Sequence, residues 1–219
     1  LTAPTSGTVS LFGRPLKGNE KGILPRIGSL IESPGFYPNL TGTENLQIFA
    51  RLRGLKSPNY IKGALELVNL PYRDKKRYAQ YSLGMKQRLA IALAVMHDPE
   101  LLILDEPING LDPIGIAEVR DFIRALCDER GKTILISSHI LSELSALATH
   151  YAFIDRGRML ETISAADLRE RCRDCLELRV DAAARAAQVL EEQLGPRDFE
   201  VLPQERLRLY AFLDHPQTV

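Results

Sequence analysis

The chain has 219 residues, of which 45% are hydrophobic, and 28 Lys and Arg balance 28 Asp and Glu. This length and apolar content can bury a substantial core, which excludes a disordered tail and favours one mixed domain with an appendage. Zero net charge excludes a global field that would attract nucleic acid or an anionic membrane surface. Neither a run long enough to span a membrane nor a signal peptide is found, which favours a soluble protein.

The chain contains three cysteines, Cys127, Cys172 and Cys175, which are too few for a disulfide framework and agree with a reducing cytoplasm. Cys172 and Cys175 have the spacing of redox pairs and half zinc sites, but no second Cys or His pair lies at metal spacing. We interpret them as structural thiols.

The first third of the chain predicts two strands followed by two helices. Apolar runs at 8–12 and 26–31 are typical of strands, and the second run delivers Glu32 to a loop. Apolar residues then recur at helical spacing from Thr43 and again from Tyr60 to Leu70. Taken by itself, Glu32 has the features of a solvated charge.

A helix rich in strong helix formers is predicted from Leu83 to Met96, with Ser82 as its N-cap. Its start would present free backbone N–H groups, the Ser82 hydroxyl and Gly84, which permits close approach, so an anion could dock there. An ordinary capped core helix is the alternative interpretation.

The run Leu101–Leu104 predicts a strand buried on both faces of a parallel sheet, and Asp105 and Glu106 follow where this strand ends. Open α/β sheets bind ligands beyond the carboxyl ends of their strands. One carboxylate there can hold Mg²⁺ through water, and the next can orient or deprotonate an attacking water, as phosphoryl transfer requires. A strand that runs into an acidic turn is the alternative interpretation.

The next segment predicts a helix capped by Asp112 and then a second buried strand, Thr133–Ser138. This strand–helix–strand unit is expected to be parallel, which places His139 beside Asp105 and Glu106. A histidine after a strand is more often structural, but its position at a neighbouring strand end favours a role in the site.

The composition changes beyond Ser164, after a short helix and a hairpin near residues 151–162. A strand, helix, strand, strand pattern there predicts a small C-terminal α+β appendage, in which we identify no chemistry. We therefore predict a principal domain at 1–163, with a helical subdomain at about 41–98, and an accessory region at 164–219.

Five motifs follow one another along the chain: Glu32 in a loop after an apolar strand, Tyr81–Arg88, Leu101–Pro107, Asn109–Asp112 and Ser137–His139. In this order and at these intervals they resemble the nucleotide-binding subunit of ATP-binding cassette (ABC) transporters, from Leu1 to about Glu161. Within that family, Ile27–Thr41 and the S-L-G-M-K-Q-R signature are most similar to the ATPases of bacitracin, lantibiotic and multidrug exporters. The resemblance implies an α/β, P-loop NTPase-like fold with a mixed sheet.

The resemblance also implies roles for the acidic strand end and its neighbours. Asp105 matches the residue that holds Mg²⁺ through water, and Glu106 matches the base that polarises the hydrolytic water. His139 matches the switch histidine that senses the γ-phosphate. Glu32 stands where most members have a glutamine that touches Mg²⁺ and couples to the membrane subunit; a carboxylate keeps an oxygen ligand but adds charge.

Ser82 and Gly84 match signature positions that bind the γ-phosphate of ATP held by the opposite subunit, and Asp112 matches a loop that crosses the dimer interface. Two signature positions depart from the commonest pattern: Leu83 replaces a glycine and Met85 a glutamine, as is frequent in exporters of this subgroup.

No G-x-x-x-x-G-K-[ST] occurs in the sequence, although the family places this phosphate loop before a segment like Leu1–Gly7. The chain thus resembles a cassette whose first strand, Walker A loop and helix are absent. Without the lysine and the nest of backbone amides, this polypeptide is expected to bind ATP poorly. The sheet is expected to keep an unpaired edge and an exposed apolar surface.

The resulting hypothesis is an ATP- and Mg²⁺-dependent ATPase subunit that forms a homodimer and energises a separate membrane permease, for export of peptide antibiotics or drugs. It implies a cytoplasmic protein at the inner face of the cell membrane, with no nucleic acid partner. One alternative is a soluble cassette ATPase acting on nucleic acid or ribosomes, which usually has two cassettes or a coiled-coil insertion. Another alternative is a catalytically silent regulatory cassette, but the presence of Glu106 and His139 argues against it.

Overall fold

The structure of the protein is a computed structural model that describes residues 4–31, 34–173, 175–193 and 199–210. The chain divides into two units, Leu1–Leu147 and Ala148–Val219. Among the described residues, no helix has the length and apolar character needed to cross a membrane.

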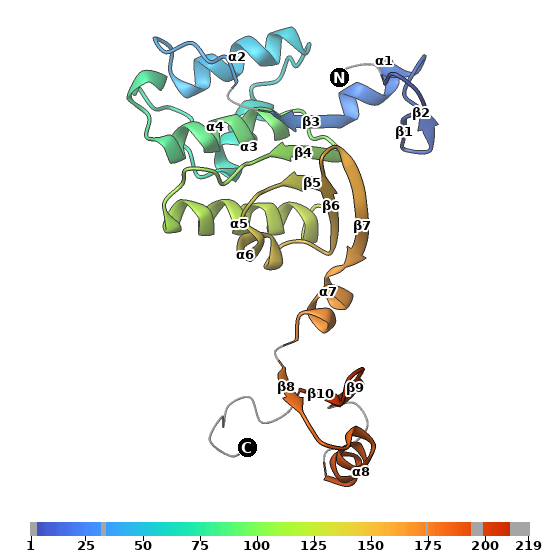
Figure 1. The fold of residues 1–219 in the computed structure, drawn as a ribbon. Helices are drawn as coiled ribbons and strands as arrows, with labels where there is room; N and C mark the ends of the chain where they lie inside the picture. The colour runs from blue at the N-terminus through green and yellow to red at the C-terminus, as the bar shows by residue number, and fades with distance from the viewer. Residues whose placement is uncertain (1–3, 32–33, 174, 194–198, 211–219) are drawn as a thin grey trace. The chain divides into compact units, whose positions relative to one another are not determined.

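The first unit is an α/β arrangement (Figure 1). Its elements are β1 (Ser10–Leu11), β2 (Arg14–Pro15), α1 (Glu20–Ile23), η1 (Leu24–Arg26), β3 (Ile27–Leu30), α2 (Gly42–Leu52), α3 (Asn59–Leu67), η2 (Tyr78–Gln80), α4 (Leu83–Val95), β4 (Leu101–Asp105), α5 (Pro113–Asp128), β5 (Thr133–Ser137) and α6 (Leu141–Ser145). β1 and β2 form a separate antiparallel pair. The stretch predicted as a helical subdomain thus contains α2, α3 and α4.

The central sheet has the strand order β3-β4-β5, and both pairings are parallel. β4, α5 and β5 therefore form the parallel strand–helix–strand unit predicted from the sequence, which confirms that expectation. The register aligns Leu30 with Leu104 and Asp105 with Ser137, so the carboxyl ends of the strands meet at one edge.

The prediction that the strand at 133–138 is buried is wrong. Ile134 and Ile136 are half-buried, whereas Leu135 is 61% exposed. The physical reason is position, because β5 is an outer strand of the described sheet and pairs there with β4 alone. β4 lies in the middle, and its Leu102 and Leu104 are almost fully buried.

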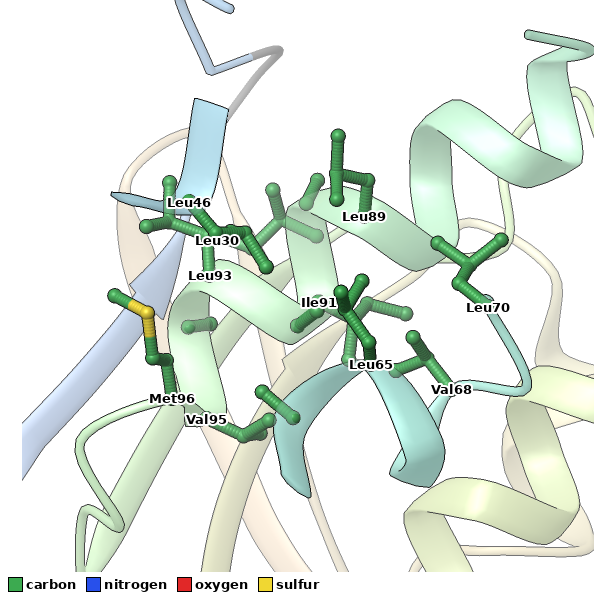
Figure 2. Close-up of a cluster of buried hydrophobic side chains, with 14 of the residues drawn as sticks. Leu30, Leu46, Leu65, Val68, Leu70, Leu89, Ile91, Leu93, Val95 and Met96 are labelled. Atoms are coloured by element: carbon green, nitrogen blue, oxygen red, sulfur yellow. The ribbon is translucent and has the colours of Figure 1, made fainter. Parts of the chain in front are cut away.

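Helix α4 forms the centre of the core, because every side chain from Leu89 to Val95 is buried. It packs against β3 and against the helices α2 and α3. Figure 2 shows the resulting cluster, in which Leu30 from β3, Leu46 from α2 and Leu65 from α3 meet the α4 side chains. Burying each such leucine stabilises the fold by about 2 kcal/mol.

Helix α2 begins at Gly42, one residue before the predicted start. A capping box sets this position, since Glu44 N donates to Thr41 Oγ1 at 3.2 Å and Thr41 N donates to Glu44 Oε2 at 2.8 Å. The bond from Thr41 N is the largest cause that lowers the pKa of the Glu44 carboxyl, and the Thr41 hydroxyl, which donates to Glu44 Oε2 at 3.0 Å, lowers it further.

The second unit contains an antiparallel hairpin and a small α+β arrangement, as the sequence predicts. Its elements are β6 (His150–Asp155), β7 (Arg158–Ser164), α7 (Ala165–Arg171), β8 (Leu176–Arg179), α8 (Ala183–Gln193), β9 (Phe199–Leu202) and β10 (Arg206–Leu209). β10 pairs antiparallel with β8 and β9, and α8 packs against β9 and β10.

The division after Leu147 differs from the domain boundary expected after residue 163. The hairpin β6–β7 is bonded mainly within itself, and β7 leads directly into α7, whose first turn is capped by Ser164. The hairpin therefore belongs to the second unit by its contacts.

Candidate functional site at the carboxyl edge of the central sheet

An acid pair and an imidazole meet at the carboxyl edge of the central sheet. Asp105 is the last residue of β4, Glu106 follows it, and His139 comes two residues after β5. His139 Nδ1 lies 2.9 Å from Glu106 Oε2. This contact confirms the prediction that His139 lies beside the acidic strand end, and it joins residues that are 33 positions apart.

The His139–Glu106 pair is open to solvent, since the two side chains are 63% and 32% exposed. An ion pair at such a site contributes at most about 1 kcal/mol to stability, because water screens it. The pair therefore contributes little to the stability of the fold.

The backbone of Glu106 is in the left-handed region, with φ of 45°. A non-glycine residue pays roughly 1 kcal/mol for this conformation, and such strain persists where the surroundings impose it. Glu106 N donates to the Ser137 carbonyl oxygen at 3.2 Å and to Ser137 Oγ at 3.1 Å, and Asn109 N donates to Glu106 O at 3.1 Å. These bonds hold the turn that directs the carboxylate toward His139.

From the sequence, Ser137 is named only as part of the Ser137–His139 motif, and no role in the site is predicted for it. Its hydroxyl donates to Asp105 Oδ1 at 2.5 Å and also accepts the bond from Glu106 N. The signal that could have revealed it is the register, because parallel pairing of β4 with β5 aligns Ser137 with Asp105.

Ser82 caps α4 as predicted, since its Oγ accepts from Met85 N at 3.2 Å. Its carbonyl oxygen accepts from Lys86 N, so both bonds remain within the first turn. A Cβ added at Gly84 would have only Leu111 Cδ2 nearby, at 3.9 Å. Packing among the described residues therefore does not require a glycine there, and the helix start stays accessible to an anion.

Asp112 caps α5 as predicted, with Gly115 N donating to Asp112 Oδ1 at 3.0 Å. The preceding turn contacts the start of α4, because a Cβ at Gly110 would lie 3.1 Å from Leu83 Cδ2. The structure thus brings the α4 start beside the loop that leads to Asp112. Leu83 and Ile114 are exposed large apolar residues here.

Glu32, the remaining predicted site residue, lies outside the described residues. The strand before it, β3, ends at Leu30, which is in register with Leu104 at the same edge of the sheet as Asp105.

The described residues contain no group of three or more His, Cys, Asp and Glu that could hold a metal ion. Asp105 nevertheless offers an exposed carboxylate, whose Oδ1 is bound by Ser137. A single carboxylate suits Mg²⁺, which keeps several waters and takes its other ligands from phosphates.

Comparison with known proteins identifies relatives along nearly the whole chain. A family model described as "ABC transporter" matches residues 1–109. The bacitracin transport ATP-binding protein BcrA of Enterococcus faecalis is 49% identical over 212 residues, which cover 97% of this chain and 68% of that protein. BcrA of Bacillus licheniformis is 48% identical, over 97% of this chain and 70% of that protein. The lantibiotic transport ATP-binding protein SrtF of Streptococcus pyogenes is 45% identical, over 73% of this chain and 68% of that protein.

Solved structures have the same architecture. The ATP-binding cassette MJ0796, in a dimeric post-hydrolysis state bound to ADP and Pi, aligns with a TM-score of 0.64 at 22% identity over 75% of each chain. An ATP binding subunit of an ABC transporter aligns with a TM-score of 0.65 at 29% identity, over 77% of this chain and 71% of that chain. These likenesses confirm the predicted α/β, P-loop NTPase-like fold class.

Proposed function

Because the chain belongs to the ABC transporter family of ATP-binding ATPases, we propose that it energises a separate membrane permease that exports peptide antibiotics or drugs. The relatives that support this substrate class are named for transport of bacitracin and of a lantibiotic. The match to BcrA covers both units of the chain, so the similarity that supports the export role is not limited to the ATPase fold.

The observation that carries the proposal is the 2.9 Å contact between His139 Nδ1 and Glu106 Oε2 beside Asp105. In the proposed reaction, Glu106 polarises the water that attacks the γ-phosphate of ATP, and His139 contacts that phosphate and orients Glu106. Asp105 would hold Mg²⁺ through water, with Glu32 as a further oxygen ligand from the β3 loop. When bound, Mg²⁺ neutralises charge on the phosphate oxygens.

We further propose that the active species is a homodimer. Ser82 and Gly84 at the start of α4 would bind the γ-phosphate of ATP held by the second copy, and the loop at Asp112 would cross the interface. The exposed apolar side chains of Leu83 and Ile114 beside this helix start support an interface there. Residues 1–163 would form the ATPase domain, including the hairpin that its contacts group with the second unit, and residues 164–219 would form an accessory region. The protein would lie at the inner membrane face, bound to its permease.

The test uses the full-length native protein, reconstituted with its permease in lipid vesicles, and measures ATP hydrolysis with and without bacitracin. We expect Glu106→Gln to lower the turnover number by at least about 100-fold, because the general base is removed. Glu129→Gln is the matched control, since Glu129 is an exposed residue at the end of α5.

Two outcomes would contradict two separate parts of the proposal. Full hydrolysis by Glu106→Gln would contradict the assignment of the catalytic base. The export role would fail, and the ATPase assignment would stand, if bacitracin and lantibiotics do not stimulate a normal rate of hydrolysis and cells lacking the gene keep their drug sensitivity.

A further inference from the structure

A single hydroxyl group connects the two acidic residues of the site. The Ser137 hydroxyl donates to Asp105 Oδ1 at 2.5 Å and accepts from Glu106 N at 3.1 Å. A serine hydroxyl has one proton to donate, so the bond to Asp105 uses its donor while the bond from Glu106 uses an acceptor position. Each bond thereby fixes the orientation that the other requires.

The bond to Asp105 leaves one carboxylate oxygen, Oδ2, for other ligands. An Asp105 side chain without this bond would rotate about its terminal torsion, for which no single orientation is strongly preferred. Ser137 therefore selects the orientation in which Oδ1 faces β5.

The bond from Glu106 N supports a turn that strains the backbone. Glu106 has φ of 45°, and its N–H is shared between the carbonyl and hydroxyl oxygens of Ser137. In this conformation Glu106 Oε2 reaches His139 Nδ1 at 2.9 Å. The same serine thus supports the geometry of both acids.

We propose that Ser137 is a positioning residue for ATP hydrolysis, which orients Asp105 toward the Mg²⁺ site and holds Glu106 in its left-handed turn. This inference rests on the proposed roles of Asp105 and Glu106. Groups that orient metal-binding carboxylates typically change metal affinity or activity by about 10- to 100-fold when they are removed.

The neighbouring Ser138 provides a matched control. Its hydroxyl accepts from Ile140 N at 3.1 Å, which is a local bond in the following turn. Ser138→Ala removes the same chemical group one position away and leaves both bonds of Ser137 intact.

The experiment compares Ser137→Thr with Ser137→Val, which have the same shape and differ in the hydroxyl group. Position 137 is exposed, so both side chains fit without repacking the core. The first measurement is amide hydrogen exchange at Glu106 in the nucleotide-free full-length protein. We expect exchange to be about 10-fold faster in Ser137→Val, and unchanged in Ser137→Thr and Ser138→Ala.

The second measurement is Mn²⁺ affinity by electron paramagnetic resonance, with a non-hydrolysable ATP analogue, followed by the turnover number with Mg²⁺. We expect Ser137→Val to lower the Mn²⁺ affinity and the turnover number by about 10-fold each, and Ser137→Thr to keep native values. Native exchange, affinity and turnover in Ser137→Val would overturn the inference. If Ser137→Val behaves like the native protein while Glu106→Gln abolishes hydrolysis in the same preparation, only the inference about Ser137 fails. If Glu106→Gln remains active, the proposed function itself fails.

Discussion

Arg53 donates a hydrogen bond to His97, with Nη1 of the arginine 2.6 Å from Nδ1 of the histidine. His97 Nε2 lies 3.0 Å from the Ile27 carbonyl oxygen, which can only accept, so Nε2 carries the proton and Nδ1 accepts from Arg53. Arg53 also donates to the Leu93 carbonyl oxygen at 3.0 Å. The neutral imidazole therefore links the ends of α2 and α4 to the start of β3.

This link predicts a pH dependence of stability. Burial lowers the pKa of His97 below its ordinary value of 6.5 and the charge of Arg53 lowers it further, while the Ile27 carbonyl and Asp98 act in the opposite direction. The unfolded chain then binds a proton more readily than the folded one. The contribution of neutral His97 is complete above about pH 6.5 and is lost as the pH falls through the lowered pKa.

Urea unfolding of the native protein between pH 7.5 and pH 5 checks this expectation. The midpoint should fall on acidification, and the fall should be smaller in His97→Gln, while His150→Gln, at an exposed position in β6, should behave like the native protein. Parallel curves for the native protein and His97→Gln would count against the link.

Gly28→Ala should destabilise the protein by about 3 kcal/mol, because β3 and α4 are in direct backbone contact there. A Cβ at Gly28 would overlap the Ala94 carbonyl oxygen and would lie 2.7 Å from Leu102 Cδ2. Gly63→Ala in α3 is the matched control, since a Cβ there meets nothing within 4 Å and a helical alanine gains up to about 1 kcal/mol. The thermal unfolding temperatures of both variants test this expectation. An unchanged unfolding temperature in Gly28→Ala would contradict the close packing of β3 against α4.

Asn45→Ala should cost about 3 kcal/mol, because Asn45 is fully buried and satisfies both backbone groups of Tyr37. Asn45 Oδ1 accepts from Tyr37 N at 2.7 Å, and Nδ2 donates to Tyr37 O at 3.1 Å and to Thr41 O at 3.0 Å. The substitution should also release the segment that leads into α2, seen as faster amide exchange at Tyr37. Asn59→Ala, on the exposed start of α3, should change the unfolding free energy by less than about 0.5 kcal/mol.

The 219-residue polypeptide by itself should bind ATP weakly, because its sequence contains no G-x-x-x-x-G-K-[ST] loop to hold the phosphates. Calorimetric titration with Mg²⁺ and ATP should show no saturation below about 1 mM. BcrA of Enterococcus faecalis, measured in parallel, is the positive control. Micromolar binding by the 219 residues would disprove this expectation.

The sequence by itself determined the elements that form the site, but not the short elements β2 and α1 before them. The caps at Ser82 and Asp112 and the parallel unit of β4, α5 and β5 could be predicted because capping and apolar periodicity depend on residues within a few positions of one another. The same local reasoning placed His139 beside Glu106, since parallel strands end at a common edge.

Only the tertiary structure decided the hydrogen-bond partners of Ser137 and of the Arg53–His97 pair, and the exposure of Leu135 in β5. The hydrogen bonds join residues that are 32 and 44 positions apart, and the exposure follows from which strands pair. From the sequence alone, a serine at a strand end or a histidine after a helix can have many different hydrogen-bond partners. The actual partner is the group that the fold brings within hydrogen-bonding distance, because such a bond contributes energy only at that separation.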